Sequence, residues 1–266
     1  MDLQLQDKVV LVTGGSKGIG LGIVKSFLAE GARVANVNRS EAEGLQLEAD
    51  YAARGQDCVF IQADLADVTA CQRAVEATIA RFGRIDVLVN NAGVNDSVGL
   101  EAGPEAFVES LQRNLIHVYA MAHYALPELK RSRGAIINIG SKVSVTGQGG
   151  TSGYAASKGG LNGLTREWAL DLARDGIRVN TVIPAEVWTP LYESLLSTLP
   201  DPAAERRQIE DMIPFEQRFT TCEEIADAVV FLASPRSSHT TGQIVFVDGG
   251  YTHFDRKYSA TAVAAP

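Results

Sequence analysis

The sequence has few of the residues that hold small secreted domains or metal centres together. It contains only three cysteines and four histidines in 266 residues. Cys58, Cys71 and Cys222 are odd in number, widely spaced and form no C-x-x-C pair, which predicts reduced thiols of an intracellular protein. No His, Cys, Asp or Glu cluster has metal-ligand spacing, so we expect no metal site and interpret His117 and His123 as structural.

Long apolar runs and an excess of positive charge are also missing. No run approaches the ~20 apolar residues that cross a bilayer, and residues 1–8 lack the apolar region of a signal peptide. The formal net charge is −8, which disfavours nucleic acid or an anionic membrane as a partner. We therefore expect a soluble, cytoplasmic protein that acts on a small molecule.

Short apolar, β-branched runs alternate with helical patterns along the chain. The runs lie at residues 8–13, 33–37, 58–62, 85–89, 135–139, 177–183 and 244–247. This alternation predicts an α/β fold with a parallel sheet and helices on both faces. Ligands on such sheets lie past the carboxyl ends of the strands, where Gly14, Asn38, Asp64 and Asn90 fall.

The first apolar run ends in a glycine-rich turn that leads into a helical pattern. The turn contains Gly14, Ser16, Lys17, Gly18, Ile19 and Gly20. Strand, glycine turn and helix together bring backbone amides and a helix N-terminus up to a pyrophosphate. Tight turns also need glycine for purely structural reasons, but the placement here favours dinucleotide binding.

The residues after the second run bear on the choice of cofactor. Sequences that select NAD usually carry an acidic residue here for the ribose 2′-hydroxyl, whereas an arginine accommodates a 2′-phosphate. This chain has Asn38 and Arg39 instead of a carboxylate, and Lys17 adds a second cation. The pattern predicts NADP, with NAD possible. The alternative is that Arg39 only caps the helical stretch 41–53 from outside.

Tyr154 and Lys158 are four residues apart, which places them one turn apart on one face of a helix. A free tyrosine titrates near 10, and lowering its pKa to about 7 requires roughly 4 kcal/mol of differential stabilisation. One lysine does not supply this alone, so a bound cationic ring or further hydrogen bonds would contribute. The alternative is an ordinary amphipathic helix with a surface lysine. Ser141 follows the fifth run, and Asn114 interrupts a helical stretch, where it is either exposed or holds a buried water.

Residues from about 185 to 221 carry several prolines and a mixed pattern. A long loop of this kind in a compact domain is often a lid or binding segment. We therefore expect one catalytic domain over residues 1–255 with a lid at about 185–221, followed by a disordered or accessory tail at residues 256–266.

The ordered set of motifs resembles the short-chain dehydrogenases/reductases over about residues 5–250. It comprises Thr13-Gly14-x-x-x-Gly18-Ile19-Gly20, Asn90-Asn91-Ala92-Gly93, Asn114, Ser141, Tyr154-x-x-x-Lys158 and the segment from Pro184 to Thr189. The resemblance implies a single-domain, doubly wound Rossmann fold with a seven-stranded parallel sheet, assembled as a homotetramer.

The resemblance also implies residue roles. Tyr154 would be the general acid/base, Ser141 would hold the substrate oxygen, Lys158 would bind the nicotinamide ribose and lower the pKa of the tyrosine, and Asn114 would hold a relay water. Asp64 and Leu65 would contact the adenine, Asn90 to Gly93 (Asn90, Asn91, Ala92, Gly93) the adjoining ribose, and Val187 and Thr189 the carboxamide.

The lid segment from Glu186 to Tyr192 resembles that of the sugar-oxidising L-fucose dehydrogenases and the related type 14 17β-hydroxysteroid dehydrogenases. Ala185 departs from the glycine usual in the family, and the steroid-type relatives tend to carry an acid where this chain has Asn38. Near the mouth of the site, polar groups suit neighbouring sugar hydroxyls and would be costly to desolvate against a steroid; these are Gln148, Glu186, Asn95 and Lys142.

The leading hypothesis is an NADP-dependent oxidation of the anomeric hydroxyl of L-fucose or a related sugar to the lactone, with substrate contacts from Ser141, Tyr154, Gln148, Glu186 and Asn95. One alternative is a carbonyl reductase of a 3-oxoacyl or steroid-like substrate. A remote alternative is a catalytically silent NADP sensor.

Overall fold

The computed structural model describes residues 1–255, and the tail predicted at residues 256–266 lies outside the described residues. A seven-stranded parallel sheet with the strand order β3-β2-β1-β4-β5-β6-β7 forms the centre of the molecule. The strands are β1 (Val9–Thr13), β2 (Arg33–Asn38), β3 (Cys58–Gln62), β4 (Val87–Asn90), β5 (Ala135–Ile139), β6 (Arg178–Pro184) and β7 (Ile244–Val247). The predicted fold class is confirmed.

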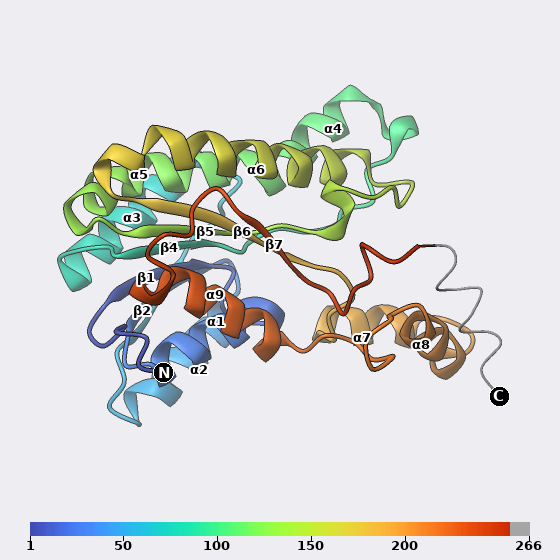
Figure 1. Cartoon of the computed structure of the whole chain (residues 1–266), viewed down its shortest axis with the longest axis horizontal. Helices are drawn as coiled ribbons and strands as arrows, with labels where there is room; N and C mark the ends of the chain where they lie inside the picture. The colour runs from blue at the N-terminus through green and yellow to red at the C-terminus, as the bar shows by residue number, and fades with distance from the viewer. Residues whose placement is uncertain (256–266) are drawn as a thin grey trace.

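Helices cover both faces of this sheet (Figure 1). One layer contains α1 (Gly18–Ala29), α2 (Glu41–Ala52) and α9 (Cys222–Ala233), and the opposite layer contains α3 (Val68–Phe82), α5 (His117–Ser132) and α6 (Ser152–Asp171). Successive β1 residues point to opposite faces, so Val10 packs in the cluster under α1 and α9, while Leu11 packs in the cluster under α3 and α5. Burial on both faces explains why the strands read as continuous apolar runs.

The helical stretch that contains Asn114 is divided by a π-turn. Helix α4 (Gly103–Leu111) continues through the π-helical segment η2 (Gln112–Ile116) into α5. Asn114 lies inside this segment and is fully buried. A π-turn of this kind often marks a functional position, because it changes the direction in which the helix presents its side chains.

The lid segment is helical, so the predicted long loop is wrong. It contains α7 (Pro190–Ser197) and α8 (Pro202–Asp211), which lie together near one end of the molecule (Figure 1). Thr189 caps α7 and Asp201 caps α8, each by accepting a backbone N–H bond. Each cap precedes a proline at the first helical position, where proline needs no N–H partner and has a suitable φ.

Candidate active site

The motif residues gather along the carboxyl edge of the sheet. Because all seven strands are parallel, the segments that follow β1, β2, β4, β5 and β6 emerge at this same edge. The register pairs Ile139 of β5 with Val182 of β6, and the Gly140 amide donates to the Val182 carbonyl over 2.8 Å. Ser141 and the Pro184 segment therefore begin side by side.

The glycine turn is tightly packed against the segment after β4. A Cβ added to Gly20 would lie 2.1 Å from the Gly14 carbonyl oxygen, so only glycine fits there. The Asn91 Nδ2 donates to the carbonyls of Thr13 and Gly14 over 2.9 and 3.0 Å. The backbone amides of Asn91 and Ala92 both donate to the Thr13 hydroxyl over 3.0 Å. Asn91 thus fastens two loops together.

Two amide side chains of β2 hold the hydroxyl of Ser16. Asn36 Nδ2 donates to Ser16 Oγ over 2.9 Å, and Asn38 Nδ2 donates to the same oxygen over 2.5 Å. Asn36 Oδ1 also accepts the Gly15 amide over 3.1 Å. Asn36 is fully buried and was not among the predicted residues. The sequence feature that could have identified Asn36 is a polar residue inside an otherwise apolar strand.

Lys17 is paired with a carboxylate that the sequence pattern did not reveal. Its Nζ lies 2.5 Å from Glu43 Oε1, and both side chains are exposed. The hydrogen bond from Lys17 holds the pKa of the Glu43 carboxyl below its usual value. Position 38 carries no acid, as predicted, but an acid from the first turn of α2 neutralises the predicted second cation. A phosphate bound here would compete with Glu43 for Lys17.

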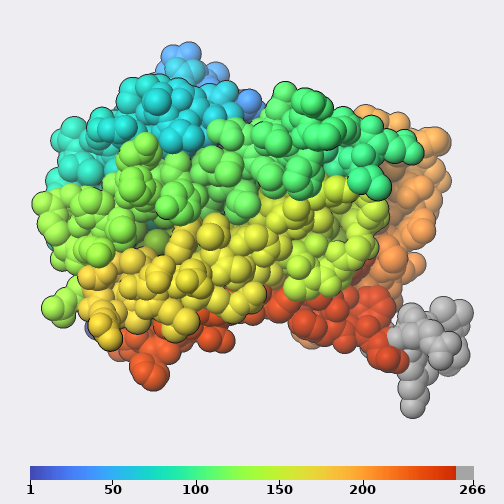
Figure 2. All heavy atoms as spheres, turned by 90° about the horizontal axis from the view of Figure 1, so that it is seen from above, coloured from blue at the N-terminus to red at the C-terminus, as the bar shows by residue number. Residues whose placement is uncertain are grey.

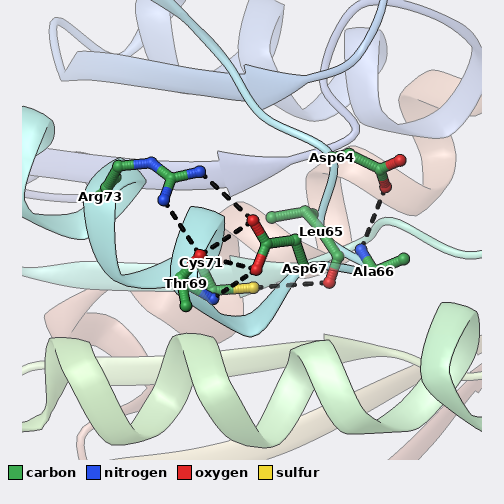
Figure 3. Close-up of polar contacts among 7 residues, drawn as sticks. All are labelled: Asp64, Leu65, Ala66, Asp67, Thr69, Cys71 and Arg73. Carbon is green, nitrogen blue, oxygen red and sulfur yellow. Dashed lines mark hydrogen bonds and ion pairs between the residues drawn. The ribbon is translucent and has the colours of Figure 1, made fainter.

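A cavity of about 570 Å³ lies between β3 and α3, and Arg39 and Asp64 both line it. Asp67 and Arg73 line its α3 side. Figure 3 shows that Asp67 contacts both Thr69 and Arg73, while Asp64 accepts the Ala66 amide. The Arg73 guanidinium lies 3.3 Å from Asp67 Oδ2. Within residues 1–255 the Arg39 guanidinium forms no ion pair, so it is available to an anion. Arg73 is a second cation of this cavity that sequence reasoning missed.

Tyr154, Ser141 and Lys158 come together at the start of α6. The Ser141 side chain lies close enough to Tyr154 to lower the pKa of its phenol, and the Lys158 Nζ lies 5.6 Å from the centre of the Tyr154 ring. Lys158 is 3 % exposed, and its Nζ donates to the Ile139 carbonyl over 2.8 Å. The geometry therefore does not match the alternative of an ordinary helix with a surface lysine.

The pKa values of these groups differ from the simplest expectation. Burial raises the pKa of Tyr154, and the nearby Ser141 side chain acts in the opposite direction. Burial also lowers the pKa of Lys158 to about 8. In the cofactor-free chain the lysine therefore does not produce a low tyrosine pKa. A cationic ring bound beside the phenol would supply the missing stabilisation of the phenolate.

Asn114 uses its side chain to connect segments. Its Oδ1 accepts the Val94 amide over 2.7 Å, and its Nδ2 donates to the Ser110 carbonyl over 3.1 Å. A Cβ on Gly93 would lie 3.2 Å from Asn114 Oδ1 and 3.3 Å from Lys158 Nζ. Both polar groups are therefore close to Gly93, although Asn114 and Lys158 are buried. The relay water stays a prediction.

Val187 and Thr189 follow β6 and begin the segment at residues 185–221. Val187 forms a parallel bridge with Thr220, and the methyl of Thr189 lies 3.4 Å from the position that a Cβ on Gly18 would take. The segment after β6 therefore lies against the glycine turn at Thr189, and contact of Val187 and Thr189 with a cofactor stays a prediction.

The predicted substrate residues lie in different surroundings. Gln148 and Asn95 are exposed, and no contact within the described residues joins either to Ser141 or Tyr154. Glu186 is only 7 % exposed. It pairs with Lys142 and accepts a hydrogen bond from the Tyr192 hydroxyl over 2.6 Å. Glu186 and Lys142 are thus engaged with each other, and their contact with a substrate stays a prediction.

No group of three His, Cys, Asp or Glu residues within residues 1–255 is arranged to hold a metal ion. In the same part of the chain, no helix is both long enough and apolar enough to span a membrane.

Comparison with known proteins identifies the family. Residues 14–252 match the family model described as enoyl-(acyl carrier protein) reductase. The chain belongs to the short-chain dehydrogenase/reductase family. It is 37 % identical to an L-fucose dehydrogenase of Bos taurus over 99 % of this chain and 97 % of that protein. The crystal structure of Cj0485 dehydrogenase is 43 % identical, with a TM-score of 0.91 over 96 % of this chain and 98 % of that one.

A third similar protein is L-sorbose reductase from Gluconobacter frateurii, whose crystal structure is a complex with NADPH and L-sorbose. It matches with a TM-score of 0.92 and 28 % identity over 96 % of this chain and 100 % of that one. Members of the short-chain dehydrogenase/reductase family are nicotinamide-dependent oxidoreductases. The predicted family and the general class of reaction are therefore confirmed.

Proposed function

We propose that this oxidoreductase uses NADP to oxidise the anomeric hydroxyl of L-fucose or a closely related sugar to the lactone. Residues 1–255 would form its catalytic domain, with residues 185–221 as the lid. The main support is that Tyr154, Ser141 and the buried Lys158 meet at the carboxyl edge of the sheet. The choice of a sugar is supported by the similarity to an L-fucose dehydrogenase over nearly the whole chain.

Tyr154 would take the proton of the anomeric hydroxyl. The proximity of Ser141 and Tyr154 supports contact of both hydroxyls with one substrate oxygen. Ser141 would donate to that oxygen as the phenolate of Tyr154 accepts its proton. Lys158, whose ammonium is fixed on the Ile139 carbonyl, would hold positive charge beside the phenol and contact the nicotinamide ribose. Asn114 would hold the water that returns the proton to solvent.

The chain's own groups fit a nicotinamide dinucleotide, which would supply the hydride acceptor of the reaction. Gly20 brings the backbone of its turn close enough for a pyrophosphate to meet the N-terminus of α1. Arg39 stands at the cavity of about 570 Å³ with no carboxylate paired to it among the described residues, which favours a 2′-phosphate. Asp64 and Leu65 would contact the adenine there. Val187 and Thr189 would contact the carboxamide.

An assay on purified protein tests the reaction. We expect L-fucose to reduce NADP⁺ faster than an acetoacetyl thioester oxidises NADPH, measured by nicotinamide absorbance at several pH values. Tyr154→Phe should lower turnover by about 10²–10⁴-fold, the typical contribution of a general base. Tyr124→Phe, which changes a phenol on α5, is the control. Reduction of the thioester alone would refute the sugar assignment, and unchanged turnover in Tyr154→Phe would refute the role of the phenol.

A second candidate function is reduction of a 3-oxoacyl or steroid-like carbonyl. The lid exposes large apolar side chains, with Leu191 72 % and Leu195 58 % exposed, which could cover an acyl chain. The matching family model is described as enoyl-(acyl carrier protein) reductase, which names an acyl substrate. The thioester assay above distinguishes this candidate from the sugar dehydrogenase.

The cofactor assignment has its own experiment. Removal of a charged hydrogen-bonding group costs about 1.5–3 kcal/mol, so Arg39→Ala should weaken NADP binding by roughly 10- to 100-fold and leave NAD binding nearly unchanged. Arg54→Ala, which removes an exposed arginine just beyond α2, is the matched control. Equal affinities of Arg39→Ala and the unmodified protein for NADP would refute the 2′-phosphate assignment.

We further propose a homotetramer. Helices α5 and α6 lie side by side on one broad face of the molecule (Figure 2). Tyr119 of α5 is 56 % exposed and Leu170 of α6 is 78 % exposed on these helices. Burial of this face between two copies would remove apolar surface from water. Light scattering of the purified protein tests the tetramer, and a monomeric mass would refute it.

A further inference from the structure

A largely buried ion pair lies beside Ser141 and is not explained by the proposed reaction. Lys142 directly follows Ser141, and its Nζ contacts Glu186 Oε1. The side chains are 16 % and 8 % exposed, respectively. Removing two charges from water is costly, so such a pair is weak support for stability by itself. Where it is retained, a role in positioning is the better explanation.

The second carboxylate oxygen of Glu186 is occupied as well. The Tyr192 hydroxyl donates to Glu186 Oε2 over 2.6 Å. Burial and the neighbouring Glu186 raise the pKa of Tyr192, so this phenol remains a hydrogen-bond donor throughout the neutral range. Lys142 Nζ also lies 4.2 Å above the centre of the Tyr251 ring. We call Lys142, Glu186 and Tyr192 the latch.

The members of the latch come from three segments that are distant in sequence. Lys142 begins the short turn after β5, Glu186 follows the end of β6, and Tyr192 lies in the lid helix α7. The backbone of Glu186 is fixed separately, because its carbonyl accepts the Thr220 amide over 3.0 Å. Glu186 is therefore an anchored carboxylate with one neighbour beside the catalytic serine and the other in the lid.

A third contact holds Tyr192 in this position. Its ring meets that of Phe219 edge to face, with 5.0 Å between ring centres. Trp188 packs on the same ring at 5.2 Å, and the Arg206 guanidinium of α8 lies 4.2 Å above the Trp188 ring centre. The lid helices are thus connected to Glu186 through the aromatic side chains and the Tyr192 hydroxyl.

We propose that Glu186 is a positioning residue that couples the lid to the catalytic serine. Through Lys142 it fixes the turn that carries Ser141, and through Tyr192 it holds α7 in place. A displacement of α7 would therefore change the position of Ser141, although α7 and Ser141 are not in contact. The coupling itself does not depend on the substrate, but its effect on catalysis rests on the proposed function.

Hydrogen–deuterium exchange of the cofactor-free protein tests the coupling without any substrate. Tyr192→Phe removes one hydroxyl in α7, and Lys142→Met removes one charge after β5. We expect Tyr192→Phe to speed exchange in residues 141–146 about tenfold, and Lys142→Met to speed exchange in residues 190–197 about tenfold, since each loses a charge-assisted bond. Glu186→Gln should affect both segments.

Two controls separate coupling from general destabilisation. Lys130→Met breaks another lysine–carboxylate pair, to Asp175, which spans 2.9 Å; it should leave both segments unchanged. Exchange in β1 should be the same in every variant. If each latch variant affects only its own segment, or if β1 exchanges faster by the same factor, the coupling is refuted.

Turnover then connects the latch with catalysis. Glu186→Gln should lower kcat about tenfold while NADP affinity changes less than about twofold, and Lys142→Met/Glu186→Gln should be no worse than the worse single variant. A rise in KM for the sugar with unchanged exchange would instead mean direct substrate contact and would overturn the latch. Coupled exchange in a protein that oxidises no sugar would refute the proposed function and leave the latch standing.

Discussion

His117 is the basis of a prediction about stability at acid pH. It is the first residue of α5, is 1 % exposed, and neither ring nitrogen has a hydrogen bond of normal geometry among the described residues. Burial lowers its pKa from 6.5 to about 4, and the positive charge of Lys158 acts in the same direction. The Arg113 carbonyl, one turn earlier, opposes this shift only weakly. The folded protein therefore holds a neutral imidazole.

The sign of the pH effect follows from the two pKa values. Below pH 6.5 the unfolded chain binds a proton at this residue that the folded chain refuses until about pH 4. The contribution of a neutral His117 to stability is thus complete above pH 6.5 and is lost as the pH falls towards 4. The difference between the two pKa values corresponds to about 3 kcal/mol of unfolding free energy, which is lost completely only well below pH 4. At pH 5 about 2 kcal/mol of it is lost.

Urea unfolding of the unmodified protein and of His117→Leu at pH 7.5 and pH 5 tests this prediction. Other groups titrate equally in both proteins, so the comparison isolates one imidazole. We expect the variant to lose about 2 kcal/mol less than the unmodified protein over this interval. His239→Leu, at an exposed histidine, should behave like the unmodified protein. All samples need equal protein concentration, since assembly adds to apparent stability. Parallel losses in His117→Leu and the unmodified protein would falsify the assignment of a buried neutral ring.

Three further predictions concern single features of the structure. Gly20→Ala should abolish nicotinamide cofactor binding in a fluorescence titration and lower stability by about 1–3 kcal/mol, because its Cβ would lie 2.1 Å from the Gly14 carbonyl oxygen; normal binding would contradict the close packing. Thr221→Ala should cost about 1 kcal/mol by breaking the capping box at α9, measured as a lower urea midpoint, whereas Thr221→Ser should keep it. The thiols should not react with a disulfide reagent at pH 8 in the folded protein but should all react in denaturant; rapid reaction of the native protein would show that they are less buried than described. Burial raises their pKa values to about 12 for Cys58 and about 11 for Cys71 and Cys222.

Local patterns predicted the fold and the proximity of three motif residues. Tyr154 and Lys158 had to share a helix face because they are four residues apart, and Ser141 had to emerge beside them because parallel strands end at one edge. These inferences depend on backbone periodicity, which the sequence displays directly.

The same local patterns do not predict contacts between segments that are distant in sequence. The pairing of Lys17 with Glu43 depends on how α2 begins relative to the glycine turn, and no spacing rule connects the two. Burial decides the pKa of Tyr154, and the sequence indicates only the neighbouring charge. The prolines at residues 185–221 favoured a loop. Two of them, however, directly follow the helix caps Thr189 and Asp201, where proline begins a helix.

The bonds of Asn91 have a thermodynamic consequence for ligand association. Its amide joins the segment after β4 to the end of β1 and fixes the glycine turn before any ligand binds. A preorganised loop loses little conformational entropy when it is occupied, so more of the gross interaction energy is expressed as affinity. Asn91→Ala would then slow capture of the dinucleotide more than it would speed its release, since the encounter would have to await a rare arrangement of the loop.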